Sequence, residues 1–108
     1  MVAIRVVEYL DAQGRSAYAR WFESLNAPAA AKVAAAVYQL AAGNSSSVKS
    51  VGSGVFERKI HSGPGYRVYF GRDGNVLVVL LGGSKKQRQH EAIAAAKARW
   101  NDYRRRKA

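Results

Sequence analysis

Three short apolar segments joined by turns of hairpin length constrain the fold more than any other feature of the sequence. Residues 55–60 alternate apolar and polar side chains, residues 66–70 alternate again, and residues 76–81 form a continuous apolar run. The connecting segments, at 62–65 and 72–75, carry the Gly-Pro-Gly and Asp-Gly sequences typical of tight turns. Strands joined by connections this short must run antiparallel. The sequence therefore predicts a three-stranded antiparallel meander.

The first half of the chain predicts a strand followed by two helices. Residues 3–9 are rich in Ile and Val, which favours a first strand. Ser16 can cap a helix that reaches about residue 25. Asn26, followed by Pro28, is typical of the start of a second helix, which should end near residue 42, just before a glycine.

The rest of the chain supplies a loop and a last helix. The Ser- and Gly-rich stretch at 44–54 is expected to be a loop containing a short strand near 48–51. After the meander, apolar side chains recur at helical spacing and predict a final helix whose opposite face is basic. The members of this stripe are Ile93, Ala96, Trp100 and Tyr103.

These elements define a fold class. Their order is strand-helix-helix-strand-strand-strand-helix, which predicts an α+β protein with an antiparallel sheet. At 108 residues, the length is that of one domain, expected to span residues 1–108. Hydrophobic residues make up 48% of the chain, enough for an ordinary core and more than disordered proteins contain.

The positive charge is concentrated in one half of the chain. The net charge is +11, from 18 Lys and Arg against 7 Asp and Glu. Residues 1–57 contribute only +1, whereas residues 58–108 contribute +10. Part of this excess is the run from Arg104 to Lys107, which could serve only as a solubilising tail. Six further basic residues lie between Arg58 and Lys86, within the predicted sheet, and they indicate a polyanionic partner such as nucleic acid.

Several function classes are excluded by composition. The chain has no cysteine, so disulfides, thiolate metal sites and cysteine nucleophiles are impossible. His61 and His90 are the only histidines, which argues against a histidine metal site. No phosphate-binding P-loop, dinucleotide fingerprint or nucleophile elbow is present. The N-terminus lacks a secretory signal and no apolar run is long enough to span a membrane, so a soluble, cytoplasmic protein without membrane contacts is expected.

A cluster of cations is the remaining candidate for chemistry. Lys59 and Arg67 flank the first turn of the meander, and Lys85 and Lys86 follow its last strand, so these charges are expected to converge. By alternation, Arg67 and Tyr69 share a face, where the guanidinium could bind a phosphate while the ring stacks on a base. Arg67 could instead form a cross-strand ion pair with Glu57, and the two lysines could be solvated charges.

The residues from 54 to 86 carry a family resemblance. Gly-Val-Phe-Glu-Arg-Lys-Ile at 54–60, Gly-Pro-Gly-Tyr-Arg-Val-Tyr-Phe at 63–70 and Leu-Leu-Gly-Gly-Ser-Lys-Lys at 80–86 closely resemble the RelE/ParE superfamily of toxins from type II toxin–antitoxin modules. The likeness is to its HigB-like "addiction module killer protein" branch, and it extends over most of the chain. It implies a RelE-like fold.

The resemblance also implies a reaction. Members commonly cleave messenger RNA on the ribosome through attack of a ribose 2′-hydroxyl on the adjacent phosphate, with no metal or other cofactor. By position, Arg67, Lys59 and Lys86 match the basic residues that stabilise the phosphate. This chain has Ser84 where the branch usually has an acidic residue, and it lacks the tyrosine early in the final helix. His90 or Glu91 therefore becomes the substitute candidate for proton transfer, although the pattern favours His90 as an ordinary exposed helix residue.

The resemblance completes the set of expected contacts and partners. The expected RNA-contacting residues are Arg58, Tyr69, Arg72, Lys85 and Arg88. The expected partners are the ribosome, messenger RNA and a cognate antitoxin that covers the basic surface. Two alternatives remain open, because a fold does not fix an activity. One is a non-catalytic, ParE-like inhibitor of DNA gyrase, and the other is an inactive basic module that binds nucleic acid.

Overall fold

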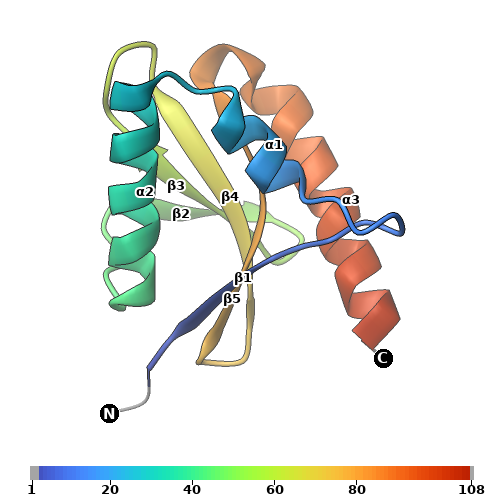
Figure 1. Ribbon diagram of the computed structural model, residues 1–108. Helices are drawn as coiled ribbons and strands as arrows, with labels where there is room; N and C mark the ends of the chain where they lie inside the picture. Colours follow the sequence, from blue (N-terminus) through green and yellow to red (C-terminus); the bar gives the residue numbers. More distant parts are fainter. Residues whose placement is uncertain (1–2, 108) are drawn as a thin grey trace.

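A computed structural model describes residues 3–107 and confirms an α+β fold with three helices and a five-stranded sheet (Figure 1). The elements in chain order are β1 (Arg5–Glu8), α1 (Ala17–Glu23), α2 (Ala27–Ala41), β2 (Val48–Gly52), β3 (Val55–Ile60), β4 (Tyr66–Asp73), β5 (Leu77–Lys85), a 3-10 turn (Lys86–Arg88) and α3 (Gln89–Lys107). No helix within residues 3–107 is both long and apolar enough to cross a membrane.

The sheet is mixed, which corrects the prediction of an antiparallel sheet. Its strand order is β1-β5-β4-β3-β2. Strands β2 to β5 form an antiparallel meander as their short connections require. β1 lies at the other edge and pairs in parallel with β5, in the register Arg5↔Leu77 to Glu8↔Leu80. The meander also has one strand more than predicted, because β2 pairs with β3 through a bulge between Ser50 and Gly52.

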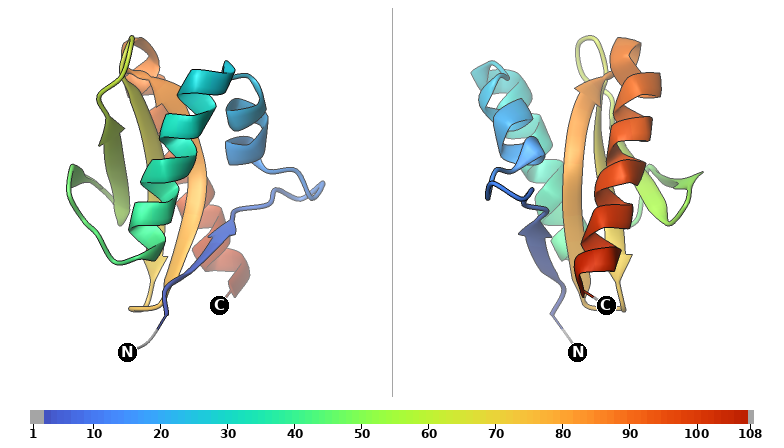
Figure 2. Two further views of the ribbon diagram at one scale, coloured as in Figure 1. Left: turned by 60° about the vertical axis from the view of Figure 1, so that its left-hand side comes forward. Right: turned by 90° about the vertical axis from the view of Figure 1, so that its right-hand side faces the viewer.

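Helices cover both faces of this sheet. Figure 2 shows α1 and α2 on one side of the strands and α3 on the other. Side chains of β4 alternate between the two faces of the sheet, as predicted. Tyr66, Val68 and Phe70 belong to the core under α1 and α2. Tyr69 joins the second core, under α3. Arg67 projects from the same face of β4 as Tyr69, toward the α3 side.

The predicted helix starts are confirmed in detail. The Ser16 hydroxyl accepts a hydrogen bond from the Ala19 amide at 3.0 Å, and Asn26 Oδ1 accepts one from the Ala29 amide at 2.9 Å. Such caps satisfy amides that have no partner within the helix. In α2 the buried stripe includes Val33 and Leu40, which pack on the sheet.

Two tryptophan rings lie directly on bare backbone. In α3 the ring of Trp100 covers Gly71 of β4, and in α1 the ring of Trp21 covers Gly83 of β5. A Cβ at either glycine would overlap the six-membered ring above it. The absence of a side chain at these two positions therefore sets how closely α1 and α3 approach the sheet.

The C-terminal half of α3 is tied to the sheet by polar contacts. The Tyr9 hydroxyl donates to Asp102 at 2.7 Å, and the Tyr103 hydroxyl donates to Asp73 at 2.8 Å. Lys107 forms an ion pair with Asp73 at 2.5 Å. Part of the basic run at the end of the chain is thus engaged with the protein's own carboxylates.

These carboxylates predict how stability depends on pH. Hydrogen bonds from Tyr9, Arg105 and Arg106 lower the pKa of Asp102 from 3.8 to about 2. Because its folded-state pKa is depressed, the stabilisation is present above the unfolded value of 3.8 and is lost as the pH falls toward 2. The melting temperature of Asp102→Asn should therefore lie below that of the wild type at pH 6, and the difference should shrink progressively as the pH falls from about 4 through 2. A difference that stays constant across this range would contradict the assignment.

Candidate phosphate-binding site at the β3–β4 turn

The turn between β3 and β4 and the end of β5 lie side by side. The β3–β4 register pairs Lys59 with Arg67, and the β4–β5 register pairs Tyr66 with Lys85. The Lys86 amide then donates a hydrogen bond to the Gly65 carbonyl at 3.0 Å. Gly65 has a φ of +79°, a conformation that glycine adopts without strain. Backbone pairing alone therefore brings these three segments of the chain together.

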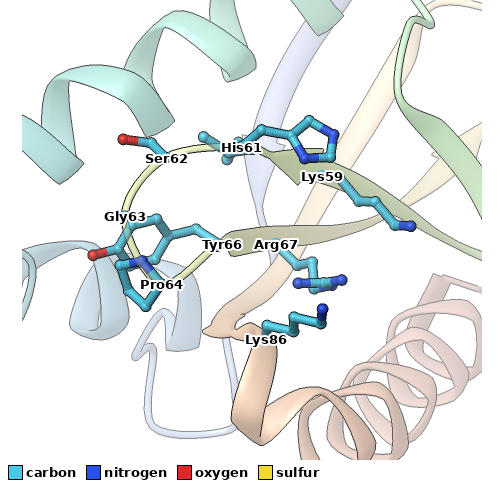
Figure 3. Close-up of a pocket in the computed structure, with 10 residues that line it drawn as sticks. Lys59, His61, Ser62, Gly63, Pro64, Tyr66, Arg67 and Lys86 are labelled. Atoms are coloured by element: carbon cyan, nitrogen blue, oxygen red, sulfur yellow. The ribbon is translucent and has the colours of Figure 1, made fainter.

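A pocket of about 440 Å³ opens between these segments. Among its lining side chains are Lys59 from β3, Arg67 from β4 and Lys86 from the 3-10 turn. Figure 3 shows these three side chains extending to the same side of the hairpin. The predicted convergence is confirmed for these three cations but not for Lys85, which does not line the pocket. Three positive charges around one pocket can bind a phosphate.

The three cations differ in how firmly they are held. Lys86 is exposed and Lys59 is half-buried, whereas Arg67 is only 7% exposed. Arg67 Nε lies 3.7 Å from Glu57 Oε1, so the cross-strand ion pair considered for this arginine is present. Arg67 combines this ion pair with a place in the wall of the pocket. It is the one fixed cation of the three, because burial restricts its rotamers.

A buried polar network lies behind Arg67. Glu57 is fully buried, and its Oε2 accepts a hydrogen bond from Gln89 Nε2 at 3.0 Å. Lys49 Nζ lies 4.0 Å from Glu57 Oε1. Next to this group, the hydroxyls of Tyr69 and Ser84 are 3.1 Å apart. Within residues 3–107, Glu57 Oε1 and Arg67 Nε have no hydrogen-bond partner, so these two buried atoms are compensated only by ion pairing.

The prediction that Tyr69 contacts RNA is wrong. Its side chain is 0% exposed and packs in the core beneath α3. Burial raises the pKa of its hydroxyl. Strand alternation correctly placed Tyr69 on the same face as Arg67, but α3 covers that face, so no base can stack on the ring.

Arg58 and Arg72 also lie away from the pocket. Arg58 is on the opposite face of β3, where it donates hydrogen bonds to the Lys59 carbonyl and to Gln39 Oε1. Arg72 is near the other end of β4, with its guanidinium 4.7 Å from the centre of the Phe56 ring. Neither arginine reaches the cation cluster, because each projects from the face of its strand that is covered by α1 and α2.

The remaining predicted residues line the start of α3 on its outer side. Lys85 and Arg88 border a different groove, between α1 and α3, and Arg88 forms an ion pair with Glu91 at 3.2 Å. His90 is exposed in the first turn of α3 and is not among the residues that line the pocket at the β3–β4 turn. Consecutive residues at a strand end and in a helical turn point in different directions, which separates Lys85 and His90 from Lys86.

The pocket contains a histidine that the sequence reading did not select. His61 follows β3 directly and lies on the rim of the pocket, beside the turn (Figure 3). The available signal was its position two residues after Lys59, since alternation in an extended segment directs residues i and i+2 to the same side. The sequence predicts Glu57 only as a partner of Arg67 and gives no role to Gln89, because nothing in the local sequence marks either as buried.

Comparison with known proteins gives one clear relationship. No family model matches the chain. A protein of Haemophilus influenzae, described as an uncharacterized protein, is 44% identical to it over 78 residues. The alignment covers 71% of this chain and 79% of the Haemophilus protein. Identity at this level over most of both chains establishes common descent, and the chain belongs to the same family as this Haemophilus influenzae protein.

Proposed function

We propose that this protein is the toxin of a type II toxin–antitoxin module, of the RelE/ParE superfamily and its HigB-like branch. We propose further that it cleaves messenger RNA on the ribosome. The observation that carries the proposal is the convergence of Arg67, Lys59 and Lys86 on one pocket. The sequence motifs of residues 54–86 supply all three cations, and the α+β sheet flanked by helices is compatible with a RelE-like fold.

The proposed reaction uses a nucleophile that belongs to the RNA. The ribose 2′-oxygen forms a bond to the adjacent phosphorus, and the bond from phosphorus to the 5′-oxygen of the next nucleotide breaks. The products are a 2′,3′-cyclic phosphate and a 5′-hydroxyl. Negative charge grows on the phosphate during this step, and preorganised donors stabilise it more effectively than water does. Arg67 serves as the fixed donor, with Lys59 and Lys86 as further cations.

Proton transfer in this scheme falls to His61. The 2′-hydroxyl loses a proton as it attacks, and histidine is the side chain that most often accepts one in enzymes. The departing 5′-oxygen takes up a proton, from the protonated histidine or from solvent water, to become the 5′-hydroxyl. His61 lines the pocket that contains the three cations, whereas His90 does not. The proposed role therefore moves from His90 to His61. The proposed setting is the cytoplasm, with the ribosome, messenger RNA and a cognate antitoxin as partners.

The experiment that tests this proposal maps the 5′ ends of messenger RNA after the protein is added to translating ribosomes. We expect new ends within the open reading frame, each carrying a 5′-hydroxyl. The control variant, matched to Arg67→Ala, is Arg15→Ala. It removes an exposed arginine that pairs with Asp11 at 3.5 Å, and it should leave cleavage unchanged. Intact messenger RNA in the wild-type reaction would overturn the proposal.

A second candidate function is supported by the ion pair of Arg67. An arginine that already has a carboxylate partner can be structural, and this favours a non-catalytic, ParE-like inhibitor of DNA gyrase. Trapped gyrase–DNA cleavage complexes together with intact messenger RNA would select this function. Salt-sensitive RNA binding without cleavage or gyrase trapping would indicate an inactive basic module.

A further inference from the structure

Glu57 is a fully buried carboxylate at a site otherwise built from cations. Its side chain is 0% exposed, although it belongs to β3, two residues before Lys59. A carboxylate removed from water loses its hydration and persists only where positive charge and hydrogen bonds compensate. An anion next to a phosphate site also weakens phosphate binding by charge repulsion. Its presence at this position therefore requires an explanation.

Three elements supply the groups that surround this carboxylate. Arg67 of β4 approaches Oε1 with its Nε at 3.7 Å, and Lys49 of β2 approaches the same oxygen with its Nζ at 4.0 Å. Gln89, the first residue of α3, donates to Oε2 at 3.0 Å. Glu57 thus connects Arg67 to the start of α3. No other residue in the described part of the chain forms an ion pair with Arg67.

The guanidinium of Arg67 has two distinct edges in this arrangement. Its Nε edge is directed toward Glu57, on the buried side. Its Nη1 reaches the β3–β4 turn, where it lies 3.7 Å from the position that a Cβ on Gly65 would occupy. The turn and Arg67 both line the pocket. The far edge of the guanidinium is thereby left for a ligand, while its Nε lies within ion-pair distance of the buried carboxylate without a hydrogen bond to it.

We infer that Glu57 is a positioning residue, which holds the Arg67 guanidinium in the orientation needed to bind the phosphate in the transition state. This inference rests on the proposed function and assigns Glu57 no contact with RNA. A misplacement of a catalytic group by about 1 Å can cost on the order of 10²-fold in rate. The carboxylate therefore affects the cleavage rate through the orientation of Arg67. Because Gln89 of α3 donates a hydrogen bond to this carboxylate, the effect also depends on how α3 packs against the sheet.

The test replaces Glu57 with glutamine, which keeps the shape of the side chain and removes its charge. In ribosome-dependent cleavage, we expect kcat to fall on the order of 10²-fold while KM changes little, because the loss is in orientation of the transition state. The matched control is Glu23→Gln, which changes an exposed glutamate at the end of α1 and should leave both constants unchanged. An unchanged kcat, or a change confined to KM, would overturn the inference.

A second readout does not depend on cleavage. In nitrogen-15 NMR spectra, the Nε–H of a fixed, buried arginine gives a sharp and slowly exchanging signal. We expect this signal for Arg67 in the wild type and in Glu23→Gln, and its broadening or loss in Glu57→Gln. If the wild type cleaves no RNA, the proposed function fails, yet the spectrum still decides whether Glu57 fixes Arg67. A signal unchanged in Glu57→Gln would overturn the positioning role.

Gln89→Ala keeps the inference testable if Glu57→Gln does not fold. This variant leaves the Glu57–Arg67 pair in place and removes the hydrogen bond from α3. We expect a smaller fall in kcat in the same direction and a partly broadened Arg67 Nε–H signal. Wild-type values for both would show that the buried network does not control Arg67.

Discussion

Arg67→Ala is expected to reduce RNA cleavage by about 10²–10³-fold in kcat, the usual effect of removing one preorganised transition-state donor. The arginine is the buried cation of its pocket, so no neighbouring side chain can take over its position. Arg67→Lys should restore only part of the rate, because an ammonium cannot form the paired hydrogen bonds of a guanidinium. Single-turnover cleavage of ribosome-bound messenger RNA measures both effects.

The stability of this variant must be measured beside its activity. Removing Arg67 leaves the buried carboxylate of Glu57 without its nearest charge partner, which commonly costs about 3 kcal/mol or more. The double variant Glu57→Gln/Arg67→Ala removes both charges and should recover part of that stability without recovering cleavage. Full activity in either variant would contradict a catalytic role for Arg67.

Trp100→Ala is expected to lower the free energy of unfolding by about 3–5 kcal/mol, as for other large aromatic side chains removed from cores. The indole is 6% exposed and stacks on Tyr103, with the ring centres 5.2 Å apart and the planes at 7°. It also covers Gly54, in the turn between β2 and β3, and Gly71 of β4. Its removal would leave a cavity that two bare backbone segments cannot fill. Denaturant unfolding followed by circular dichroism gives the value.

A matched substitution tests the origin of this effect. Gly71→Ala places a methyl group where the Trp100 ring now lies, and overpacking of this kind costs about 1–3 kcal/mol. In the double variant Gly71→Ala/Trp100→Ala, the clash has no ring to act on. The two losses should therefore sum to more than the loss measured for the double variant. Additive losses would mean that the two residues are not in contact.

Local signals predicted most of the fold. The short turns imposed the antiparallel pairing of β3, β4 and β5, and the side chains of Ser16 and Asn26 marked the helix starts. The pairing of β1 with β5 could not be predicted in this way, because its partner lies in a distant part of the chain. β2 was only partly evident, since an edge strand with an exposed, polar sequence carries a weak alternation signal.

The candidate site was predictable in its cations but not in their surroundings. Alternation and turn length place Lys59 and Arg67 beside each other, and pairing of the next strand adds Lys86. Alternation shows which residues share a face, but it does not show that a distant helix covers that face. For this reason the sequence predicts Tyr69 as a contact for RNA and does not mark Glu57 as the centre of a buried network.

The dependence of the site on α3 has a consequence for synthesis of the protein. Gln89, which binds the carboxylate behind Arg67, is the first residue of the last helix, and β1 pairs with a strand made long after it. Until β5 and α3 have been made, β1 has no partner strand and Gln89 cannot reach Glu57. Folding of the N-terminal part before the rest is made therefore cannot assemble the pocket.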